Sequence, residues 1–247
     1  MFDELQNKTA WITGSKRIGQ IVVQELAKKG VNIIVSYRNS NKEAEQIIKD
    51  VKKFGVKSLA IQCDVSEKES VLSAINSISK KFKKIDILIN MASVFVPVDF
   101  EKISEKDWQL NFKTHVLGTF WPSHAVVKLM HRGGHIINIT DRTSIGKIYK
   151  GYLPYVVTKS AVASMTKGLA VELAPKGIFV NAIAPGPILR PDDISKKDWK
   201  TIRDVSPLKY AIGDSEAVRQ FTLLVLYLSS VTMASGYVYP LDQGQNL

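Results

Sequence analysis

The feature that most constrains the fold is a repeated alternation of short β-branched runs with longer helical patterns. The runs are apolar at nearly every position, which is typical of parallel strands covered on both faces. They lie at 9–13, 31–36, 58–63, 85–89, 135–139 and 178–183. Helical patterns separate them, at about 18–29, 41–54, 67–82, 105–130 and 155–174. This alternation predicts an α/β fold with a doubly wound parallel sheet and helices on both faces.

The last quarter of the chain adds a polar excursion to this pattern. We expect a substrate lid at about 187–212 that contains a short helix near 196–205, followed by a helix over 215–229 that Asp214 or Ser215 caps. The run from Gly236 to Tyr239 predicts an edge strand. Residues 1–247 are therefore expected to form a single-domain, Rossmann-like sheet of about seven strands.

The charge balance of the chain admits several kinds of partner. Its 34 Lys and Arg residues against 23 Asp and Glu residues give a formal net charge of +11. That excess fits nucleic acid, an anionic substrate or a solvated lysine-rich surface. The densest cluster, from Lys80 to Lys84, lies at the expected end of a helix, and no aromatic platform or nucleic-acid motif accompanies it. We expect a solvated surface and no nucleic-acid partner.

Several absences in the sequence narrow the class further. No run approaches the ~18 apolar residues of a membrane helix, and the first residues lack the layout of a signal peptide. The single cysteine, Cys63, excludes an intrachain disulfide and is expected to be a buried thiol. We predict a soluble, cytoplasmic protein with no membrane partner. His124, His131 and His135 show no metal-ligand spacing, so we predict no metal site.

A glycine-containing turn joins the first expected strand to the first helix. A helix N-terminus and its free N–H groups at this position can hold a pyrophosphate. Two glycines alone are a weak signal, and the alternative is an ordinary turn with Gly14 at positive φ. We expect cofactor contacts from the whole turn: Gly14, Ser15, Lys16, Arg17, Ile18 and Gly19.

The end of the second strand predicts which nucleotide binds. It carries Arg38, Asn39 and Ser40 and no acidic residue suited to the ribose hydroxyls of NAD. An arginine there can hold a 2′-phosphate, although an exposed surface arginine is the alternative. We therefore predict NADP(H) as cofactor, contacted by these three residues.

Tyr155 and Lys159 stand four residues apart, on one face of an expected helix that follows the fifth strand. A nearby cation stabilises a phenolate, so we expect a lowered pKa for Tyr155 and a role as general acid. This spacing is common by chance. Its position at the carboxyl end of the sheet, where sites of this fold form, favours a catalytic pair.

With these motifs in order, the chain resembles the short-chain dehydrogenase/reductase family over essentially its whole length. The matches are the Gly14 turn, Cys63 to Val65, Asn90 to Ser93, Asn138 with Ile139, Tyr155 with Lys159, and Asn181 through Gly186. The resemblance implies that Asp64 lies near the adenine and that Lys159 also holds the nicotinamide ribose. The further cofactor contacts that it implies are Val65, Asn90, Ala92, Ser93, Pro185, Gly186 and Ile188.

Within that family, four departures are similar to pteridine reductases and bacterial dihydropteridine reductases. Lys16 and Arg17 replace a loop glycine, Asp141 stands at the catalytic serine, Phe95 matches an aromatic that stacks a pterin, and 151–154 lead into the helix as in that subgroup. The implied substrate contacts are Arg17, Ser93, Phe95, Asp141 and Tyr155. Other positions differ from the subgroup: the turn is one residue shorter, the 141–155 gap is one longer, and His115 replaces a proton-relay asparagine.

Charge makes Asp141 the residue that decides the substrate. A reduced ketone develops negative charge on oxygen, which a carboxylate repels, whereas a reduced C=N bond needs a proton that a carboxylic acid can supply. The alternative is a turn-forming aspartate, with Thr140, Thr143 or Ser144 as the hydroxyl donor. Phe95 can equally be core filling. His115 is a catalytic candidate, with a buried structural histidine as the alternative.

These observations predict an NADPH-dependent reductase of a pteridine-like C=N substrate, with Tyr155, Lys159, Asp141 and His115 as catalytic residues. The alternative is a carbonyl or 3-oxoacyl-thioester reductase on the same scaffold, and a non-catalytic NADP(H) sensor is a third hypothesis. Trp108 and Trp121 lie on a helix that packs subunits together in the family, so the resemblance implies a homotetramer or homodimer.

Overall fold

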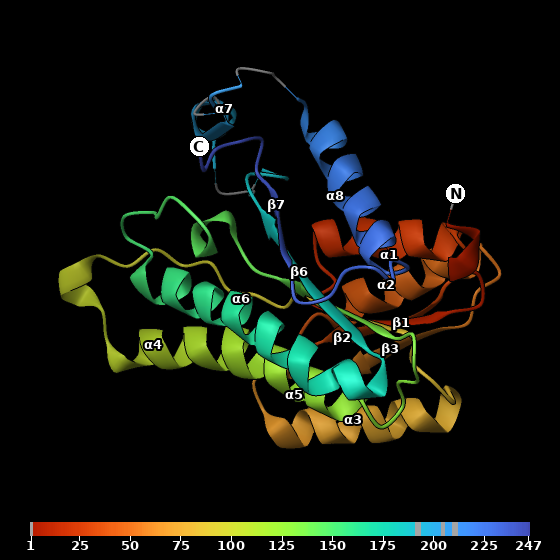
Figure 1. Cartoon of the computed structure of the whole chain (residues 1–247). Helices are drawn as coiled ribbons and strands as arrows, with labels where there is room; N and C mark the ends of the chain where they lie inside the picture. Colours follow the sequence, from red (N-terminus) through yellow and green to blue (C-terminus); the bar gives the residue numbers. More distant parts are fainter. Residues whose placement is uncertain (1, 191–193, 204–205, 209–211) are drawn as a thin grey trace.

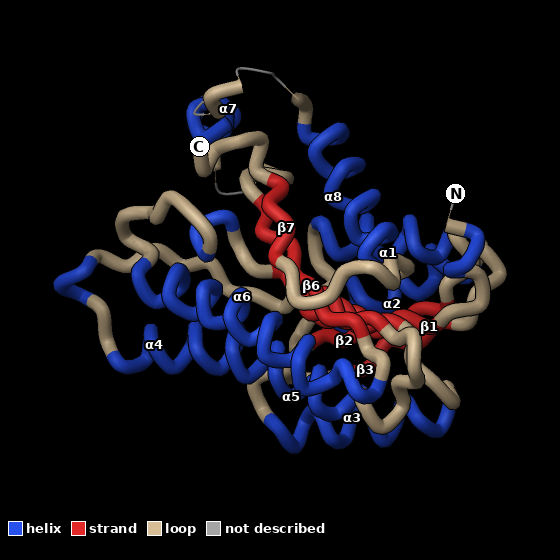
Figure 2. Tube along the Cα trace, viewed as in Figure 1, coloured by secondary structure: helices blue, strands red, loops and turns tan. Residues whose placement is uncertain are grey.

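Seven parallel strands form the centre of the protein, in a computed structural model that describes residues 2–190, 194–203, 206–208 and 212–247. Their order across the sheet is β3-β2-β1-β4-β5-β6-β7 (Figures 1 and 2). The expected doubly wound parallel sheet is confirmed. The strands are β1 (Thr9–Thr13), β2 (Asn32–Tyr37), β3 (Ser58–Gln62), β4 (Ile87–Asn90), β5 (His135–Ile139), β6 (Phe179–Pro185) and β7 (Val238–Leu241).

Two layers of helices cover the two faces of the sheet, as expected (Figure 1). One face carries α1 (Ile18–Lys28), α2 (Asn41–Lys52) and α8 (Asp214–Leu228). The other carries α3 (Lys68–Lys81), α4 (Glu105–Asn111), α5 (Gly118–Val126) and α6 (Leu153–Leu173). Each layer has its own apolar cluster, and the strands alternate residues between them: Ile12 packs in the first cluster and Trp11 in the second. Burial on both faces explains why the inner strands are mostly apolar, whereas the edge strands β3 and β7 are only partly buried.

The chain enters the sheet at β1, builds outward to β3, and returns to build β4 through β7 on the other side of β1. The switch point therefore lies between β1 and β4, where Thr13 pairs in register with Asn90. Loops diverge at such a point and leave a crevice at the carboxyl edge of the sheet. The Thr13 side chain helps to shape this edge, because its hydroxyl accepts hydrogen bonds from the backbone N–H groups of Met91 (3.1 Å) and Ala92 (3.4 Å).

The prediction of a single helix over 105–130 is wrong for the middle of that segment. The structure divides it into α4, a wider π-helical segment (Phe112–Leu117), and α5. Pro122 inside α5 has no N–H to donate to Gly118. His115 in the π-helical segment is bonded at both ring nitrogens to other parts of the chain. Tertiary contacts thus set the backbone here.

The C-terminal excursion also differs in one detail from the expectation. The residue before α8 is Gly213, and no side chain caps the helix, so the expected cap by Asp214 or Ser215 is wrong. The Asp214 carboxylate instead accepts a bond from Trp199 at 3.0 Å and pairs with Arg203 at 2.9 Å. These bonds join α8 to α7 (Lys196–Arg203), the helix of the expected lid. Residues 191–193, 204–205 and 209–211 of that lid lie outside the described residues.

Arg203 is the main anchor of the described part of this segment. Its guanidinium donates to the carbonyl oxygens of Pro187, Ile188 and Ile212 at 2.7 to 3.2 Å. Whether the segment acts as a lid stays a prediction. Among the described residues, none of the helices is both long and apolar enough to span a bilayer.

Candidate active site

The glycine turn after β1 packs so tightly that its two glycine positions have no room for a side chain. Gly14 has φ of 73°, and a Cβ atom there would lie 2.7 Å from the Ala92 backbone. A Cβ atom on Gly19 would lie 2.5 Å from the Gly14 carbonyl oxygen. Both glycines are therefore required for the turn to pack against the chain that follows β4. The turn leads directly into α1, which begins at Ile18, and Ser15 is buried within it.

Two cations of the turn point in different directions. Lys16 lies 3.4 Å from Glu43 at the start of α2, and both side chains are more than half exposed. Arg17 has the unusual φ of 55° and donates from Nη2 to the Leu189 carbonyl oxygen at 2.7 Å. Arg17 thus connects the turn to the expected lid, and its contact with a cofactor or substrate stays a prediction.

Arg38 lies at the end of β2 with its side chain 55% exposed. Its nearest carboxylate is Asp64 beyond β3, at 4.0 Å, which is a loose pairing. Asp64 turns its other oxygen to Ser66, accepting from the hydroxyl at 2.6 Å and from the backbone N–H at 3.0 Å. Arg38 and Asp64, which are predicted to contact different parts of the adenosine half of a cofactor, are therefore neighbours. Of the other predicted contacts, Ser40 precedes α2, and Val65 is buried beside Gly118.

The catalytic half lies at the carboxyl ends of β4, β5 and β6. Asn90 is buried, and its amide donates to Ser123 and to Asn138, both at 2.9 Å. Gly186 follows β6, and a Cβ atom there would lie 2.9 Å from the Asp242 backbone. Pro185 closes the strand. Ala92, Ser93 and Ile188 complete the set of predicted cofactor contacts at this edge.

Tyr155 and Lys159 extend from the first turns of α6, which begins earlier than expected, at Leu153. The Tyr155 hydroxyl donates to Asp141 Oδ2 at 2.9 Å, and the Lys159 ammonium lies 5.8 Å from the centre of the tyrosine ring. Lys159 Nζ donates to the Ile139 carbonyl oxygen at 2.8 Å. The structure thus brings Tyr155, Lys159 and Asp141 together.

The expected lowering of the Tyr155 pKa is wrong for this state of the protein. The pKa of Tyr155 is raised well above 10, first because the ring is buried and then because the Asp141 carboxylate faces its hydroxyl. Burial also lowers the pKa of Lys159 to about 8, although Asp141 opposes that shift. Sequence spacing showed the cation near the phenol. It did not show that the carboxylate lies nearer.

Two of the three candidate hydroxyl groups after β5 donate to other groups, whereas the buried Thr143 hydroxyl has no hydrogen-bond partner among the described residues. Thr140 donates to the Lys159 carbonyl oxygen at 2.7 Å, and Ser144 donates to the Asp141 carbonyl oxygen at 2.6 Å. Asp141 itself accepts from the Thr143 backbone N–H at 2.9 Å and so begins the 3₁₀ turn Arg142–Ser144. Asp141 is therefore both a turn-forming aspartate and the partner of Tyr155.

His115 is a buried neutral imidazole that connects three segments. Its Nδ1 lies 2.9 Å from the Thr158 hydroxyl, and its Nε2 lies 3.0 Å from the Ser93 hydroxyl and 3.2 Å from the Val94 backbone nitrogen. Burial and the charge of Lys159 lower its pKa to about 2. The ring therefore fixes the segment after β4 against α6, which is a positioning arrangement, and a proton-relay role stays a prediction.

An aromatic wall borders the catalytic pair. Phe95 stacks on Tyr152 with 4.3 Å between ring centroids and an angle of 13°, and it meets Tyr155 edge-on at 4.8 Å. Tyr149 completes the wall, 6.3 Å from Phe95. Phe95 is 46% exposed, so it is not core filling. The sequence did not predict Tyr149 as a residue of this wall, nor Arg142 beside it. The sequence feature that could have pointed to Arg142 is its position next to Asp141.

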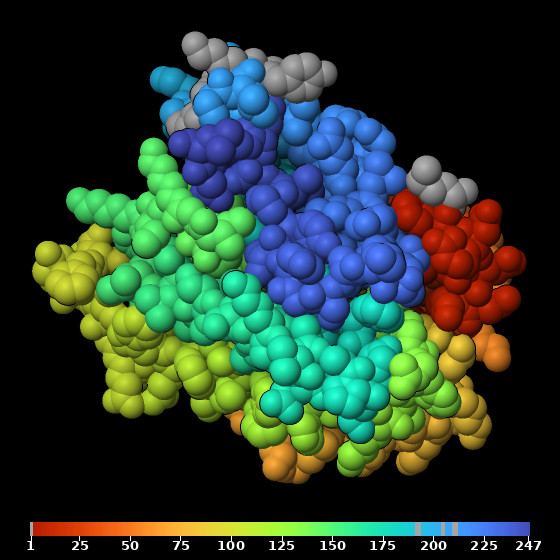
Figure 3. Space-filling view, viewed as in Figure 1, coloured from red at the N-terminus to blue at the C-terminus, as the bar shows by residue number. Residues whose placement is uncertain are grey.

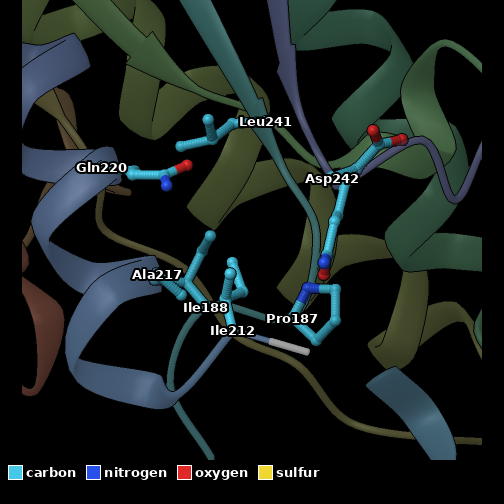
Figure 4. Close-up of a pocket in the computed structure, with 8 residues that line it drawn as sticks. Pro187, Ile188, Ile212, Ala217, Gln220, Leu241 and Asp242 are labelled. Carbon is cyan, nitrogen blue, oxygen red and sulfur yellow. The ribbon is translucent and has the colours of Figure 1, made fainter. Parts of the chain in front are cut away.

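A pocket lies next to this site, between the ends of β6 and β7 and helix α8 (Figure 4). It is mostly apolar, and Ile188, a predicted cofactor contact, borders it. Tyr155 and Asp141 are absent from its lining, so the pocket is separate from the catalytic pair. The lining residues are Pro187, Ile188, Ile212, Ala217, Gln220, Leu241, Asp242 and Gln243.

A family model described as short chain dehydrogenase matches residues 8–201. The chain belongs to this family. It is therefore an oxidoreductase, as predicted. The chain is 36% identical over 184 residues to the 3-oxoacyl-[acyl-carrier-protein] reductase FabG of Staphylococcus epidermidis, covering 73% of this chain and 75% of that protein.

Solved structures of the family superpose on nearly the whole chain. A short chain dehydrogenase from Burkholderia cenocepacia in complex with NADP has a TM-score of 0.88 and 25% identity, covering 98% of this chain and 99% of that one. A blue fluorescent protein from a metagenomic library, in complex with NADPH, has a TM-score of 0.89 and 27% identity, with the same coverage. These comparisons support the family resemblance and do not extend to pteridine reductases in particular.

Proposed function

We propose that this oxidoreductase reduces the carbonyl group of an oxoacyl compound with NADPH. The observation that carries the proposal is the buried Tyr155 hydroxyl beside Lys159 at the carboxyl edge of the sheet, next to the switch point. Similarity to a 3-oxoacyl-thioester reductase supports the carbonyl substrate, which was the alternative in the sequence analysis. The pteridine hypothesis becomes the second candidate.

The residues of the nucleotide half fit NADPH. Gly14 and Gly19 have no side chain and no room for one, so the backbone of the turn can approach a pyrophosphate closely. Arg38 is half exposed at the end of β2, where a guanidinium can hold a 2′-phosphate. Neighbouring structures contain NADP and NADPH, which supports the same choice for this chain. NADPH supplies the hydride when bound.

The catalytic residues manage the proton. In the structure Tyr155 donates to Asp141, so its hydroxyl has to turn toward the substrate oxygen to protonate it. Lys159, as an ammonium, favours the phenolate that remains. Its pKa of about 8 keeps it charged at neutral pH. Tyr155 is thus the proposed acid. Lys159 is proposed to stabilise the phenolate and to bind the nicotinamide ribose.

The second candidate is reduction of a C=N bond in a planar, pteridine-like ring. One observation favours it: Asp141, which stands where a neutral hydroxyl would stabilise an alkoxide, accepts a hydrogen bond from the Tyr155 hydroxyl at 2.9 Å. A carboxylic acid in that place, or a carboxylate that orders a water, can supply a proton to nitrogen. Phe95 is exposed enough to face a planar ring, although it stacks on Tyr152 here.

A substrate panel separates the candidates. NADPH oxidation is followed with methyl acetoacetate, an acetoacetyl thioester, a quinone and a dihydropteridine side by side. We expect the highest kcat/KM with the oxoacyl compounds. A preference for the dihydropteridine would transfer the assignment to C=N reduction. NADPH binding without turnover of any of the four would support the sensor hypothesis.

Assembly and location are also proposals. The exposed side chains of Trp108 and Phe112, four residues apart on α4 and its continuation, give one face of this helix an apolar surface, which supports a homo-oligomer. Trp121 is partly buried and packs with the cluster beneath α3 and α5. The cytoplasmic location inferred from the single cysteine stays a prediction.

A further inference from the structure

A buried arginine without a full set of partners lies beside the catalytic pair. Arg142 follows Asp141 directly and is only 6% exposed. Within the described residues, its Nε and Nη1 atoms have no hydrogen-bond partner. Asp141 is occupied by other donors, namely the Thr143 N–H and the Tyr155 hydroxyl. Buried charges in proteins are normally paired and hydrogen-bonded, and among the described residues Arg142 forms no ion pair, so this guanidinium can take an added anion.

The position of Arg142 defines where that anion would lie. Its guanidinium lies over the Tyr149 ring, 4.7 Å from the ring centre, and Tyr149 belongs to the aromatic wall. Its Cδ atom lies 3.6 Å from the point where a Cβ atom of Gly186 would be. The side chain therefore extends between the wall and the end of β6, on the same side of the sheet edge as the Asp141 and Tyr155 pair.

The C-terminal residues cover this arginine. The Asn246 amide donates to the Arg142 carbonyl oxygen at 3.1 Å, and its side-chain oxygen accepts from the Lys147 N–H at 3.1 Å. Figure 3 shows the dark blue C-terminal segment lying against the green segment that follows β5. Asp242 is also buried there, and its Oδ2 atom has no partner among the described residues, so its carboxylate is a rival partner for the guanidinium.

We propose that Arg142 binds a carboxylate group of the substrate, so that the enzyme acts on oxo acids in preference to their neutral esters; this rests on the proposed carbonyl reduction. The carboxylate would pair with the guanidinium while the carbonyl group faces Tyr155. An arginine is well suited to such pairing because charge-assisted bonds to a carboxylate are strong in a buried site. It also offsets the negative charge of Asp141, which would otherwise repel an anionic substrate.

The test compares acids with their methyl esters in the unmodified protein. Acetoacetate, 4-oxopentanoate and 5-oxohexanoate place the carboxylate at increasing distance from the carbonyl. We expect at least one acid to exceed its ester in kcat/KM by about tenfold or more. Arg142→Gln should abolish that preference, mainly by raising KM for the acid relative to its ester, while Arg142→Lys should retain part of it. Arg219→Gln, at an exposed arginine on α8 paired with Glu216, is the matched control.

Equal reduction of acids and esters by the unmodified protein, or a preference that survives Arg142→Gln, would overturn the proposal. A binding measurement separates this from failure of the proposed function. The protein loaded with NADP⁺ is titrated calorimetrically with each acid and ester, which requires no turnover. Tighter binding of an acid that is lost in Arg142→Gln supports the anion site even if nothing is reduced. If no acid binds more tightly than its ester, the guanidinium instead pairs with Asp242 or is hydrated, and the site is rejected.

Discussion

The nucleotide half and the catalytic half of the site, both at the carboxyl edge of the sheet, are held in place by different parts of the chain. Around β1 and β2, the fixed parts are backbone: Gly14 and Gly19 leave no space for a Cβ atom, and the charged side chains Lys16 and Arg38 are more than half exposed. Around β5 and α6, the fixed parts are side chains. Tyr155, Lys159 and His115 are buried, and they are hydrogen-bonded to Asp141, to the Ile139 carbonyl oxygen and to Thr158, respectively.

This difference predicts how each half responds to the substitution of a side chain. An exposed cation on a rigid backbone acts alone, so its replacement should change one property and leave the others in place. Buried polar groups in contact are coupled, so replacement of one changes the protonation of the next. Substitutions in the nucleotide half should therefore act independently, and substitutions in the catalytic half should be coupled.

The largest effect is expected at Tyr155. Tyr155→Phe removes the proposed acid and should lower kcat by roughly 10²- to 10⁴-fold, the usual range for general acid catalysis, while NADPH binds as before. Lys159→Ala should damage both turnover and binding. Stopped-flow reduction and a fluorescence titration of NADPH measure the two properties separately. Normal turnover in Tyr155→Phe would show that the catalytic half has been misidentified.

Asp141 should show the next largest effect, with a sign that depends on the substrate. Asp141→Ser replaces a carboxylate with a neutral donor, so reduction of methyl acetoacetate should improve. Reduction of a dihydropteridine should fall by about 10²-fold if the aspartate supplies or orders its proton. Measuring kcat/KM for both substrates in both proteins cancels any general damage. Parallel changes for the two substrates would refute the argument from charge.

Arg38 tests the independence of the nucleotide half. NADPH should bind at least about tenfold tighter than NADH, equivalent to ~1.4 kcal/mol, and Arg38→Ala should remove that preference without changing kcat at saturating cofactor. Titration of both cofactors decides this, with Arg219→Ala as a control at an exposed arginine on α8 that pairs with Glu216. A preference that survives Arg38→Ala, or a fall in kcat, would contradict the predicted separation.

The smallest effect is a pH dependence that reports coupling in the catalytic half. The folded pKa of Lys159 is lowered to about 8, so the ammonium is present below pH 8 and is lost above it. If only the ammonium holds the ribose, NADPH affinity should fall by about fourfold between pH 7 and pH 8.5. The Asp141 carboxylate raises the Lys159 pKa, so in Asp141→Asn the fall should begin at lower pH.

Fluorescence titrations across this pH range measure the effect. Lys159→Met, which has no titratable amine, is the control and should bind NADPH weakly without such a fall. An unchanged profile in Asp141→Asn would mean that Asp141 and Lys159 titrate independently, and the contrast between the two halves would be lost.

Hydrophobic periodicity in the sequence determined most of the fold of this protein. Strand and helix positions follow from which residues must be buried on one face or on two, and that information is local. The glycine turn and the spacing of Tyr155 and Lys159 are likewise local, because a helix fixes the relative positions of residues four apart. The sequence therefore predicted the parallel sheet and the two ends of the site without any distant contact.

Contacts between distant segments decided the rest. The spacing of Tyr155 and Lys159 predicted a lowered tyrosine pKa, but Asp141, fourteen positions earlier, reaches the hydroxyl first and burial raises the pKa instead. The π-helical turn at His115 depends on bonds to the segment after β4 and to α6. Arg142 is ordinary in the sequence, and only the packing of the C-terminal residues over it leaves a buried guanidinium beside the catalytic pair. Burial and charge pairing are properties of the assembled chain, so no local pattern encodes them.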